Sequence, residues 1–279
     1  MNTLYLEYRK CGFYCMKILI NYADGKYKKT QSFNTWTGKH VARFDKVYSF
    51  GPENIDTEFY TKNKSILDIK RGNGLWLWKP YFILKVMQEA NEGDIVFYCD
   101  SGAFFIRRID SLISTIDKES DIWVSDVPLL EKNFTKYDCF RHMDCLEDIY
   151  KNTNQIQGTF FMAINSERSR SFVRKWLTYC QDIKVLCPGD IGQMENNKEL
   201  IAHREDQSVL SLLCKKENIP VHLDPSQRGK YPRWYENKNY PYSPALHMDS
   251  YKPILFLHKT PDVNIISCLK QYIKCVLKK

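Results

Sequence analysis

The stretch GNGLWLWKPYFILKVMQEANEGDIVFYCDSG, residues 72–102, decides the fold of this chain. Pro80 favours a helix start, and apolar side chains spaced over residues 81–90 supply one face of that helix before Gly93 ends it. The apolar run 95–99 follows directly and predicts a buried strand, which terminates on Asp100-Ser101-Gly102. A helix followed by such a strand is typical of a sheet that is covered on both faces.

The same alternation continues on both sides of this stretch. Apolar runs predict further strands at 17–22, 47–50, 121–125, 159–164 and 254–257. Helical spacing predicts helices at about 104–116, over 172–180, and after Asp206, which stands where a helix N-cap belongs. The pattern therefore predicts an α/β fold with a mainly parallel sheet flanked by helices. Residues 225–253 are irregular and rich in Tyr and Pro, with one Trp, which indicates a long functional loop.

The composition predicts one large core. With 279 residues and 43% hydrophobic content, the chain is long enough to bury it. We expect an N-terminal extension over residues 1–15, a main domain over residues 16–264 and a basic amphipathic helix over residues 265–279. The ten cysteines are scattered, which predicts reduced and mostly buried thiols rather than a disulfide framework or a zinc site.

The charge balance favours an anionic partner. Lys and Arg outnumber Asp and Glu by 41 to 33, which suits a nucleotide diphosphate, a phospholipid surface or nucleic acid. Nucleic acid is disfavoured, because no helix-turn-helix, RNA-recognition or zinc pattern is visible and the basic residues do not gather. No apolar run approaches the roughly 18 residues of a spanning helix, so we expect a cytoplasmic protein. The basic C-terminal helix suits either peripheral contact with an anionic membrane or packing on the domain.

The polar residues at strand ends are the first site candidates, since ligands of open α/β sheets bind beyond the carboxyl ends of the strands. Asp100 holds such a position, where a carboxylate can bind a divalent cation or simply cap the next turn. YCDSG resembles a variant of the DxD motif of GT-A glycosyltransferases, with Gly102 in place of the second acid. The whole stretch 72–102 resembles bacterial capsule and surface-polysaccharide transferases, and the resemblance extends over about residues 17–259.

This resemblance implies a GT-A (Rossmann-like) domain with a C-terminal loop-rich acceptor segment. It also implies a nucleotide-sugar donor, expected to be UDP-linked, and a saccharide or lipid-linked saccharide acceptor. The transferred sugar would be galactose, galactofuranose or a related hexose. Mn²⁺ or Mg²⁺ would be held by Asp100, with His258 at the end of the last strand as a further metal ligand.

The segment HREDQSVL, residues 203–210, resembles motifs of two mechanistic classes. In inverting GT-A enzymes the acid at Asp206 would take the proton from the acceptor hydroxyl, which is the role we expect. In retaining enzymes of the glycogenin type, the same residue would contact the donor sugar. Asp206 as a simple helix cap is the structural alternative. A non-catalytic carbohydrate-binding module is a further alternative for the whole chain.

The remaining candidates are assigned by their place beside these motifs. Basic residues are needed to hold the leaving diphosphate, and Gly158 would let the donor approach the backbone. Aromatic rings stack on a base or sugar, or pack in the core. We expect donor binding by Asp100, Ser101, Arg71, Trp78, Lys79, Lys136, Gln157, Gly158 and Arg204. We expect acceptor binding by Trp234, Tyr235 and Tyr240.

Overall fold

The computed structural model describes residues 15–116, 119–189, 198–230 and 247–277. The strands are β1 (Lys17–Tyr22), β2 (Lys46–Phe50), β3 (Ile95–Cys99), β4 (Ala103–Phe105), β5 (Ile122–Leu130), β6 (Asn154–Ile156), β7 (Phe160–Ile164), β8 (Val221–His222) and β9 (Leu255–Leu257). The helices are α2 (Lys28–Thr37), α3 (Thr57–Lys62), α4 (Lys64–Leu67), α5 (Gly72–Leu75), α6 (Trp78–Glu89), α7 (Asp110–Ile113), α8 (Glu131–Phe134), α9 (Tyr137–His142), α10 (Asp148–Lys151), α11 (Glu167–Cys180), α12 (Ile183–Leu186), α13 (Glu205–Lys216), α14 (Gln227–Lys230) and α16 (Ile265–Leu277).

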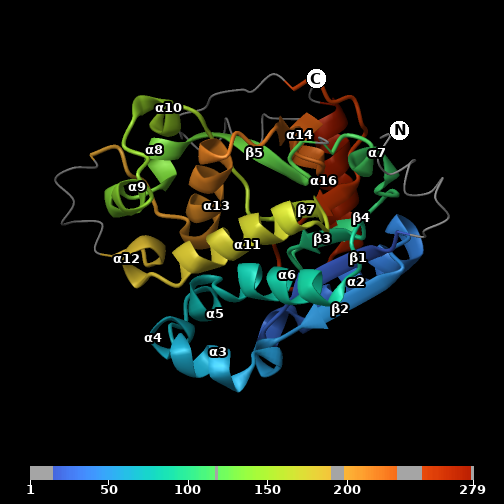
Figure 1. Ribbon diagram of the computed structural model, residues 1–279. Helices are drawn as coiled ribbons and strands as arrows, with labels where there is room; N and C mark the ends of the chain where they lie inside the picture. The colour runs from blue at the N-terminus through green and yellow to red at the C-terminus, as the bar shows by residue number, and fades with distance from the viewer. Residues whose placement is uncertain (1–14, 117–118, 190–197, 231–246, 278–279) are drawn as a thin grey trace.

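The central sheet has the strand order β2-β1-β3-β7-β5-β6, and β8 also pairs with β5 (Figure 1). β1 pairs in parallel with both β2 and β3, and β5 pairs in parallel with β8. β7 runs antiparallel to its two neighbours β3 and β5, and β6 is antiparallel to β5. The α/β architecture predicted from the sequence is confirmed. The antiparallel insertion of β7 is new, because a buried apolar run does not reveal the direction of its strand.

Helices and loops bury both faces of this sheet, which explains its continuous apolar strands. Successive side chains of a strand point to opposite faces. Ile18 and Ile20 of β1 therefore belong to one apolar cluster, together with residues of α6, α11 and α13. Leu19 belongs to a second cluster, which contains residues of β4, α7 and β9. Figure 1 shows α6 and α11 lying across one face of the sheet.

The helix predicted at about 104–116 is wrong. Residues 103–105 form the short strand β4, which pairs antiparallel with β9 near the end of the chain, and only α7 is helical in the remainder. Phe105 is buried against the rings of Phe44 and Phe97. A partner strand about 150 residues away leaves no local signal, so apolar spacing alone could not reveal this pairing.

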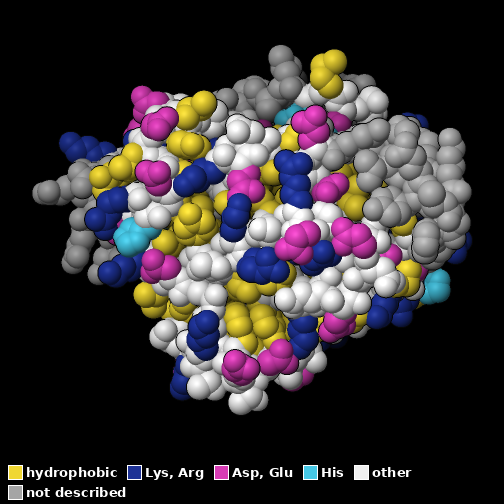
Figure 2. All heavy atoms as spheres, in the orientation of Figure 1, with side chains coloured by type: hydrophobic (Ala, Val, Ile, Leu, Met, Phe, Trp, Pro, Cys, Tyr) yellow, Lys and Arg dark blue, Asp and Glu magenta, His cyan; other side chains and the backbone are white. Residues whose placement is uncertain are grey.

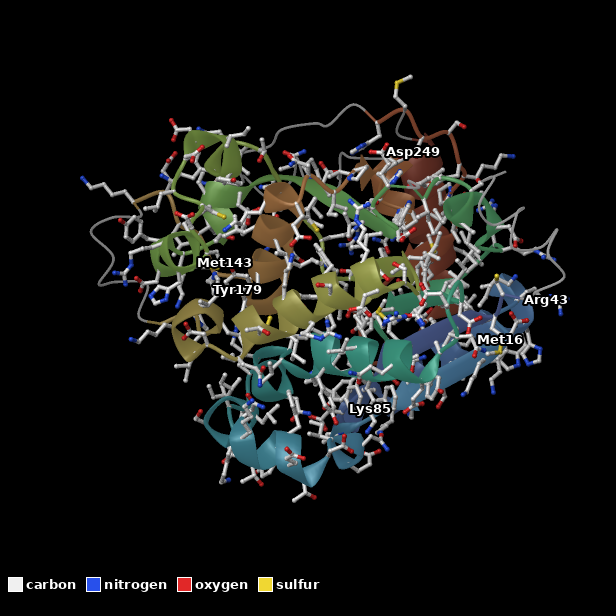
Figure 3. The ribbon with its side chains drawn as sticks, viewed as in Figure 1. Met16, Arg43, Lys85, Met143, Tyr179 and Asp249 are labelled. Carbon is white, nitrogen blue, oxygen red and sulfur yellow. The ribbon has the colours of Figure 1, made fainter. Side chains whose placement is uncertain are left out.

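Other expectations on the chain as a whole can be checked directly. Cys99, Cys139, Cys145, Cys180 and Cys214 are buried free thiols. Within the described residues no helix is long and apolar enough to cross a membrane. Figure 2 shows cationic and anionic side chains interspersed over the visible face. Lys85, for example, extends from α6 to pair with Asp56 at 2.8 Å (Figure 3).

Candidate functional site at the strand ends

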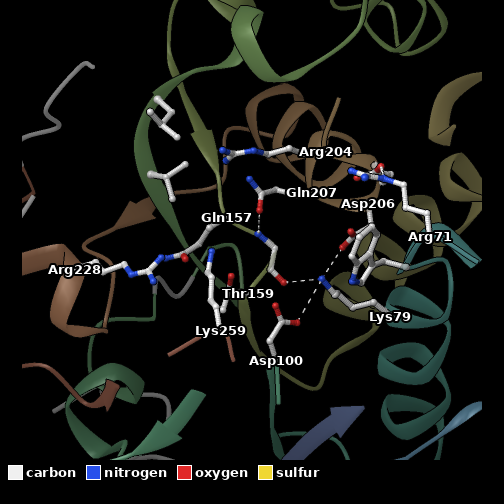
Figure 4. A pocket seen from close by; sticks show the side chains of 15 residues that line it. Arg71, Lys79, Asp100, Gln157, Thr159, Arg204, Asp206, Gln207, Arg228 and Lys259 are labelled. Atoms are coloured by element: carbon white, nitrogen blue, oxygen red, sulfur yellow. Dashed lines mark hydrogen bonds and ion pairs between the residues drawn. The ribbon is translucent and has the colours of Figure 1, made fainter. Parts of the chain in front are cut away.

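A cavity of about 320 Å³ lies at the carboxyl end of β3, next to the turn that enters β7 (Figure 4). Segments from across the chain meet there: the turn before α6, the residues after β3, the β6–β7 connection, the start of α13, α14 and the residues after β9. Five cationic side chains and three carboxylates line it: Arg71, Lys79, Arg204, Arg228, Lys259, Asp100, Glu205 and Asp206. The lining is therefore net positive when all three acids are ionised.

Lys79 lies at the base of this cavity and contacts three of its other lining residues. Its side chain is only 4% exposed, and Nζ lies 2.7 Å from Oδ2 of Asp206 and 3.7 Å from Oδ1 of Asp100. Nζ also donates a hydrogen bond of 2.9 Å to the Gly158 carbonyl (Figure 4). Burial by itself would lower the pKa of Lys79, but Asp100 and Asp206 outweigh it and the pKa is raised. Lys79 is thus a fixed positive charge between two carboxylates.

Asp206 is the acid best suited to accept a proton. It is 4% exposed and lies in the first turn of α13, a place where the helix dipole favours a carboxylate. Burial raises its pKa to about 7, although Lys79 acts in the opposite direction. The expected N-cap position is wrong, because α13 begins at Glu205 and Arg204 is the N-cap. A carboxyl group with a pKa near 7 is matched to general-base work at neutral pH.

Asp100 follows β3 as predicted and faces the cavity. Its Oδ1 accepts a hydrogen bond of 2.6 Å from the Tyr98 hydroxyl and lies near Lys79. Ser101, by contrast, is buried outside the cavity lining, and its hydroxyl donates to the Tyr22 carbonyl at 2.6 Å. Ser101 therefore fixes the turn after β3 rather than contacting a ligand in the cavity.

The connection between β6 and β7 forms a polar wall of the cavity. The Gly158 N–H donates to Oε1 of Gln207 at 3.1 Å, and Gln157 donates through Nε2 to the Ser125 hydroxyl at 2.7 Å. A side chain at position 158 would be crowded, because its Cβ would lie 3.2 Å from Oδ2 of Asp206. The predicted need for a small residue here thus has a second reason, the close approach of Asp206 to the backbone.

The cationic side chains enter from different elements. Arg71 forms an ion pair with Glu205, and Arg204 donates to Oε1 of Gln155 at 3.2 Å. Arg228 of α14 is buried, and Lys259 follows β9 with its side chain exposed in the cavity. The protein around Lys259 lowers its pKa to about 8 by limiting its hydration, and the neighbouring charge of Arg228 acts in the same direction.

Sequence reasoning missed three residues that line the cavity, namely Arg228, Lys259 and Trp76. Lys259 has a usable signal, since it stands just after the apolar run 254–257 and thus at a strand end. Arg228 has none, because its short helix lies in a segment without periodicity. Trp76 and Trp78 stand two residues apart in the sequence, but only Trp76 lines the cavity.

Besides Ser101, three predicted site residues lie outside the cavity lining. Trp78 is the first residue of α6, where it is buried and stacks on Tyr22 with ring centroids 3.6 Å apart. Lys136 is buried and donates to the Cys187 carbonyl. His258 turns to Thr260, with Nδ1 and Oγ1 3.0 Å apart, and does not line the cavity. The predicted acceptor residues Trp234, Tyr235 and Tyr240 lie outside the described residues.

The predicted metal pair is not assembled in the described part of the chain. Those residues contain no group of three or more His, Cys, Asp and Glu side chains that could hold a metal ion. Burial lowers the pKa of His258 to about 4, so its ring is neutral, but its partner is Thr260 and not Asp100.

Comparison with known proteins identifies solved structures of similar fold. No family model matches the chain, and no curated protein matches it. The solved structure of mouse xyloside xylosyltransferase 1 is similar to 88% of this chain and 98% of its own, with a TM-score of 0.50 and 8% identity. The galactosyltransferase LgtC, solved with donor and acceptor sugar analogs, covers 94% of this chain and 95% of its own at a TM-score of 0.47 and 12% identity. The chain therefore shares the fold of this xylosyltransferase structure, which is the GT-A fold expected from the sequence.

Proposed function

We propose that this chain is a glycosyltransferase that moves a hexose from a nucleotide-sugar donor to a saccharide acceptor. The observation that carries the proposal is Lys79, which holds Asp206 at 2.7 Å at the base of a net positive cavity. That cavity lies at the strand ends, where α/β folds bind their ligands. A UDP-linked donor and a polysaccharide or glycolipid acceptor of the capsule or surface kind are the finer parts of this proposal.

The chemistry follows from the cavity's charges. The acceptor hydroxyl attacks the anomeric carbon, a new C–O bond forms, and the bond from that carbon to the diphosphate oxygen breaks. Asp206 takes the hydroxyl proton, and the cationic lining stabilises the charge that develops on the leaving diphosphate. Lys79 holds the Asp206 carboxylate in place through their ion pair. Transfer would then invert the anomeric configuration.

Two rivals share these residues. In a retaining transferase Asp206 would contact the donor sugar, and the product would keep the donor's anomeric configuration. In a non-catalytic carbohydrate-binding module the same cavity would bind without turnover. The raised pKa of Asp206 favours the base over both, because a binding role gains nothing from a proton acceptor matched to neutral pH.

A donor screen tests the proposal. The full chain would be mixed with UDP-, GDP- and CMP-sugars, with and without Mn²⁺, and thermal stability and donor hydrolysis would be followed. We expect stabilisation and slow hydrolysis with one nucleotide class. Binding of free saccharides without any nucleotide response would instead support the binding module.

The dependence of kcat/KM on pH should follow the ionisation of the Asp206 carboxyl. Its carboxyl must be ionised to accept a proton, and its pKa is raised to about 7. We therefore expect kcat/KM to fall about tenfold for each pH unit below 7, since the ionised fraction falls in that proportion. Lys79, Asp100 and Glu205 are the charges that set this pKa. A profile that stays flat down to pH 5 would contradict the role of Asp206 as the titrating base.

The finer expectations on metal, membrane and location stay predictions. The described donor set does not supply a site for Mn²⁺ or Mg²⁺ with three side-chain ligands. Peripheral contact with an anionic membrane is supported by α16, where Ile265, Leu269 and Ile273 are more than half exposed along one helical stripe. A cytoplasmic location rests on the sequence alone.

A further inference from the structure

The turn after β3 has no room for the second acid of a metal-binding motif. The N–H groups of His258 and Lys259 both donate to the Gly102 carbonyl at 2.9 Å. A Cβ at position 102 would lie 3.2 Å from Cα of Lys259, so the segment after β9 packs directly on this glycine. An aspartate here would have to displace that segment. The glycine at position 102 therefore allows Lys259 to pack closely on this turn, and it provides no ligand for a metal ion.

The three carboxylates of the cavity already form ion pairs with lysine or arginine side chains. Lys79 is shared between Asp206 and Asp100, and Arg71 pairs with Glu205. A divalent cation bound to Asp100 would lie close to the Lys79 ammonium, which is 3.7 Å from Oδ1 of Asp100. Two positive charges so close together repel strongly in a buried site. Hard divalent cations also prefer several oxygen ligands, which the described residues do not provide as a group of three acids or histidines. The donor set thus does not fit a resident Mn²⁺ or Mg²⁺.

Lys259 has the properties of a residue held in place to bind an anion. Its backbone is left-handed, with φ of 58°, a conformation that is unfavourable for a residue other than glycine. Such conformations gather at ligand sites, and two other cavity residues share it, Trp76 with φ of 59° and Glu205 with φ of 39°. Among the described residues no carboxylate lies within ion-pair distance of Lys259. Burial and the charges of Arg228 and Arg204 lower its pKa, whereas the charges of Asp100 and Asp224 raise it.

We propose that Lys259, together with Arg228 and Arg204, holds the donor's diphosphate in the place that a metal ion takes in a DxD enzyme. This inference rests on the proposed function, because it assumes a nucleotide-sugar donor. All three side chains line the same cavity. A diphosphate would relieve the repulsion between Lys259 and Arg228 and accept charge-assisted hydrogen bonds from both, in which arginine can engage two oxygens at once.

Calorimetric titration of the full chain tests this, with UDP, GDP and inorganic pyrophosphate as probes, each in EDTA and in Mn²⁺. We expect UDP or GDP to bind with an affinity that differs by less than about threefold between the two conditions, with pyrophosphate binding more weakly at the same site. Lys259→Gly removes the ammonium but suits the left-handed backbone, so we expect unchanged or higher thermal stability and about 10- to 100-fold weaker binding. Lys259→Arg should stay within a few-fold of the wild type.

Lys252→Ala is the matched control, since Lys252 is an exposed lysine of the same segment outside this cavity. It should bind like the wild type. Tight nucleotide binding that needs Mn²⁺, or wild-type affinity in Lys259→Gly, would overturn the inference while leaving the glycosyltransferase proposal intact. If none of the three probes binds under either condition, both the inference and the nucleotide-dependent function fail.

Discussion

Asp206→Asn is expected to lower kcat by about 10²–10⁴-fold, the range that a positioned general base contributes. Asparagine keeps the shape of the side chain but cannot take a proton. The carboxyl is suited to that step, because burial raises its pKa to about 7 while Lys79 holds it at 2.7 Å. The measurement is single-turnover transfer of the sugar from whichever donor the screen identifies. UDP or GDP affinity should change much less than kcat, since the diphosphate would contact cations and not this acid.

Glu217→Gln is a suitable control for the loss of a carboxylate. Glu217 lies at the C-terminal end of the same helix, α13, where it pairs with Lys175 near the surface. Its replacement should leave kcat unchanged. Wild-type kcat in Asp206→Asn would eliminate Asp206 as the base. A loss of kcat with retention of anomeric configuration in the wild-type product would assign Asp206 to the donor sugar instead.

The sequence was sufficient where a residue's position on its own element decides its role. Asp100 ends a buried strand, so its place at the edge of the sheet followed from a single apolar run. Lys79 and Gly158 were marked by the segments that resemble known transferases, and the structure brings them within 2.9 Å of each other. That contact joins residues 79 positions apart, and only the folded sheet could reveal it.

The sequence was insufficient where a role depends on packing between distant segments. Trp78 and Trp76 look equivalent in the sequence, but the left-handed backbone at Trp76 directs one ring to the cavity and leaves the other stacked on Tyr22. Lys259 reaches the cavity because β9 pairs with β4 and so brings the last strand next to the turn after β3. Neither placement can be predicted from the neighbouring sequence, because both depend on contacts between distant segments.

Lys79→Met is expected to destabilise the fold by about 3–5 kcal/mol, the usual cost of removing one partner of a buried ion pair. Methionine keeps most of the volume, so the loss comes from charge and not from a cavity. The Asp206 carboxylate and the Gly158 carbonyl would both lose their buried partner. For a chain of this size the melting temperature should fall by roughly 10 °C. Lys85→Met on the same helix removes a more exposed pair with Asp56 and should cost less than about 1 kcal/mol.

The pH dependence of Lys79→Met separates the ion pair from simple packing. Without the lysine the pKa of Asp206, already raised to about 7, should rise further, because burial is then opposed by less positive charge. Above pH 6 the unfolded chain has this carboxyl ionised, whereas the folded variant keeps its proton to a higher pH than the folded wild type does. Unfolding of the variant therefore releases more protons, and its deficit in melting temperature should grow from pH 6 to pH 8. Lys79→Met combined with Asp206→Asn should recover part of the stability, because the two effects are coupled. A deficit that is the same at all pH values, with no recovery in the double variant, would mean that Lys79 contributes packing alone.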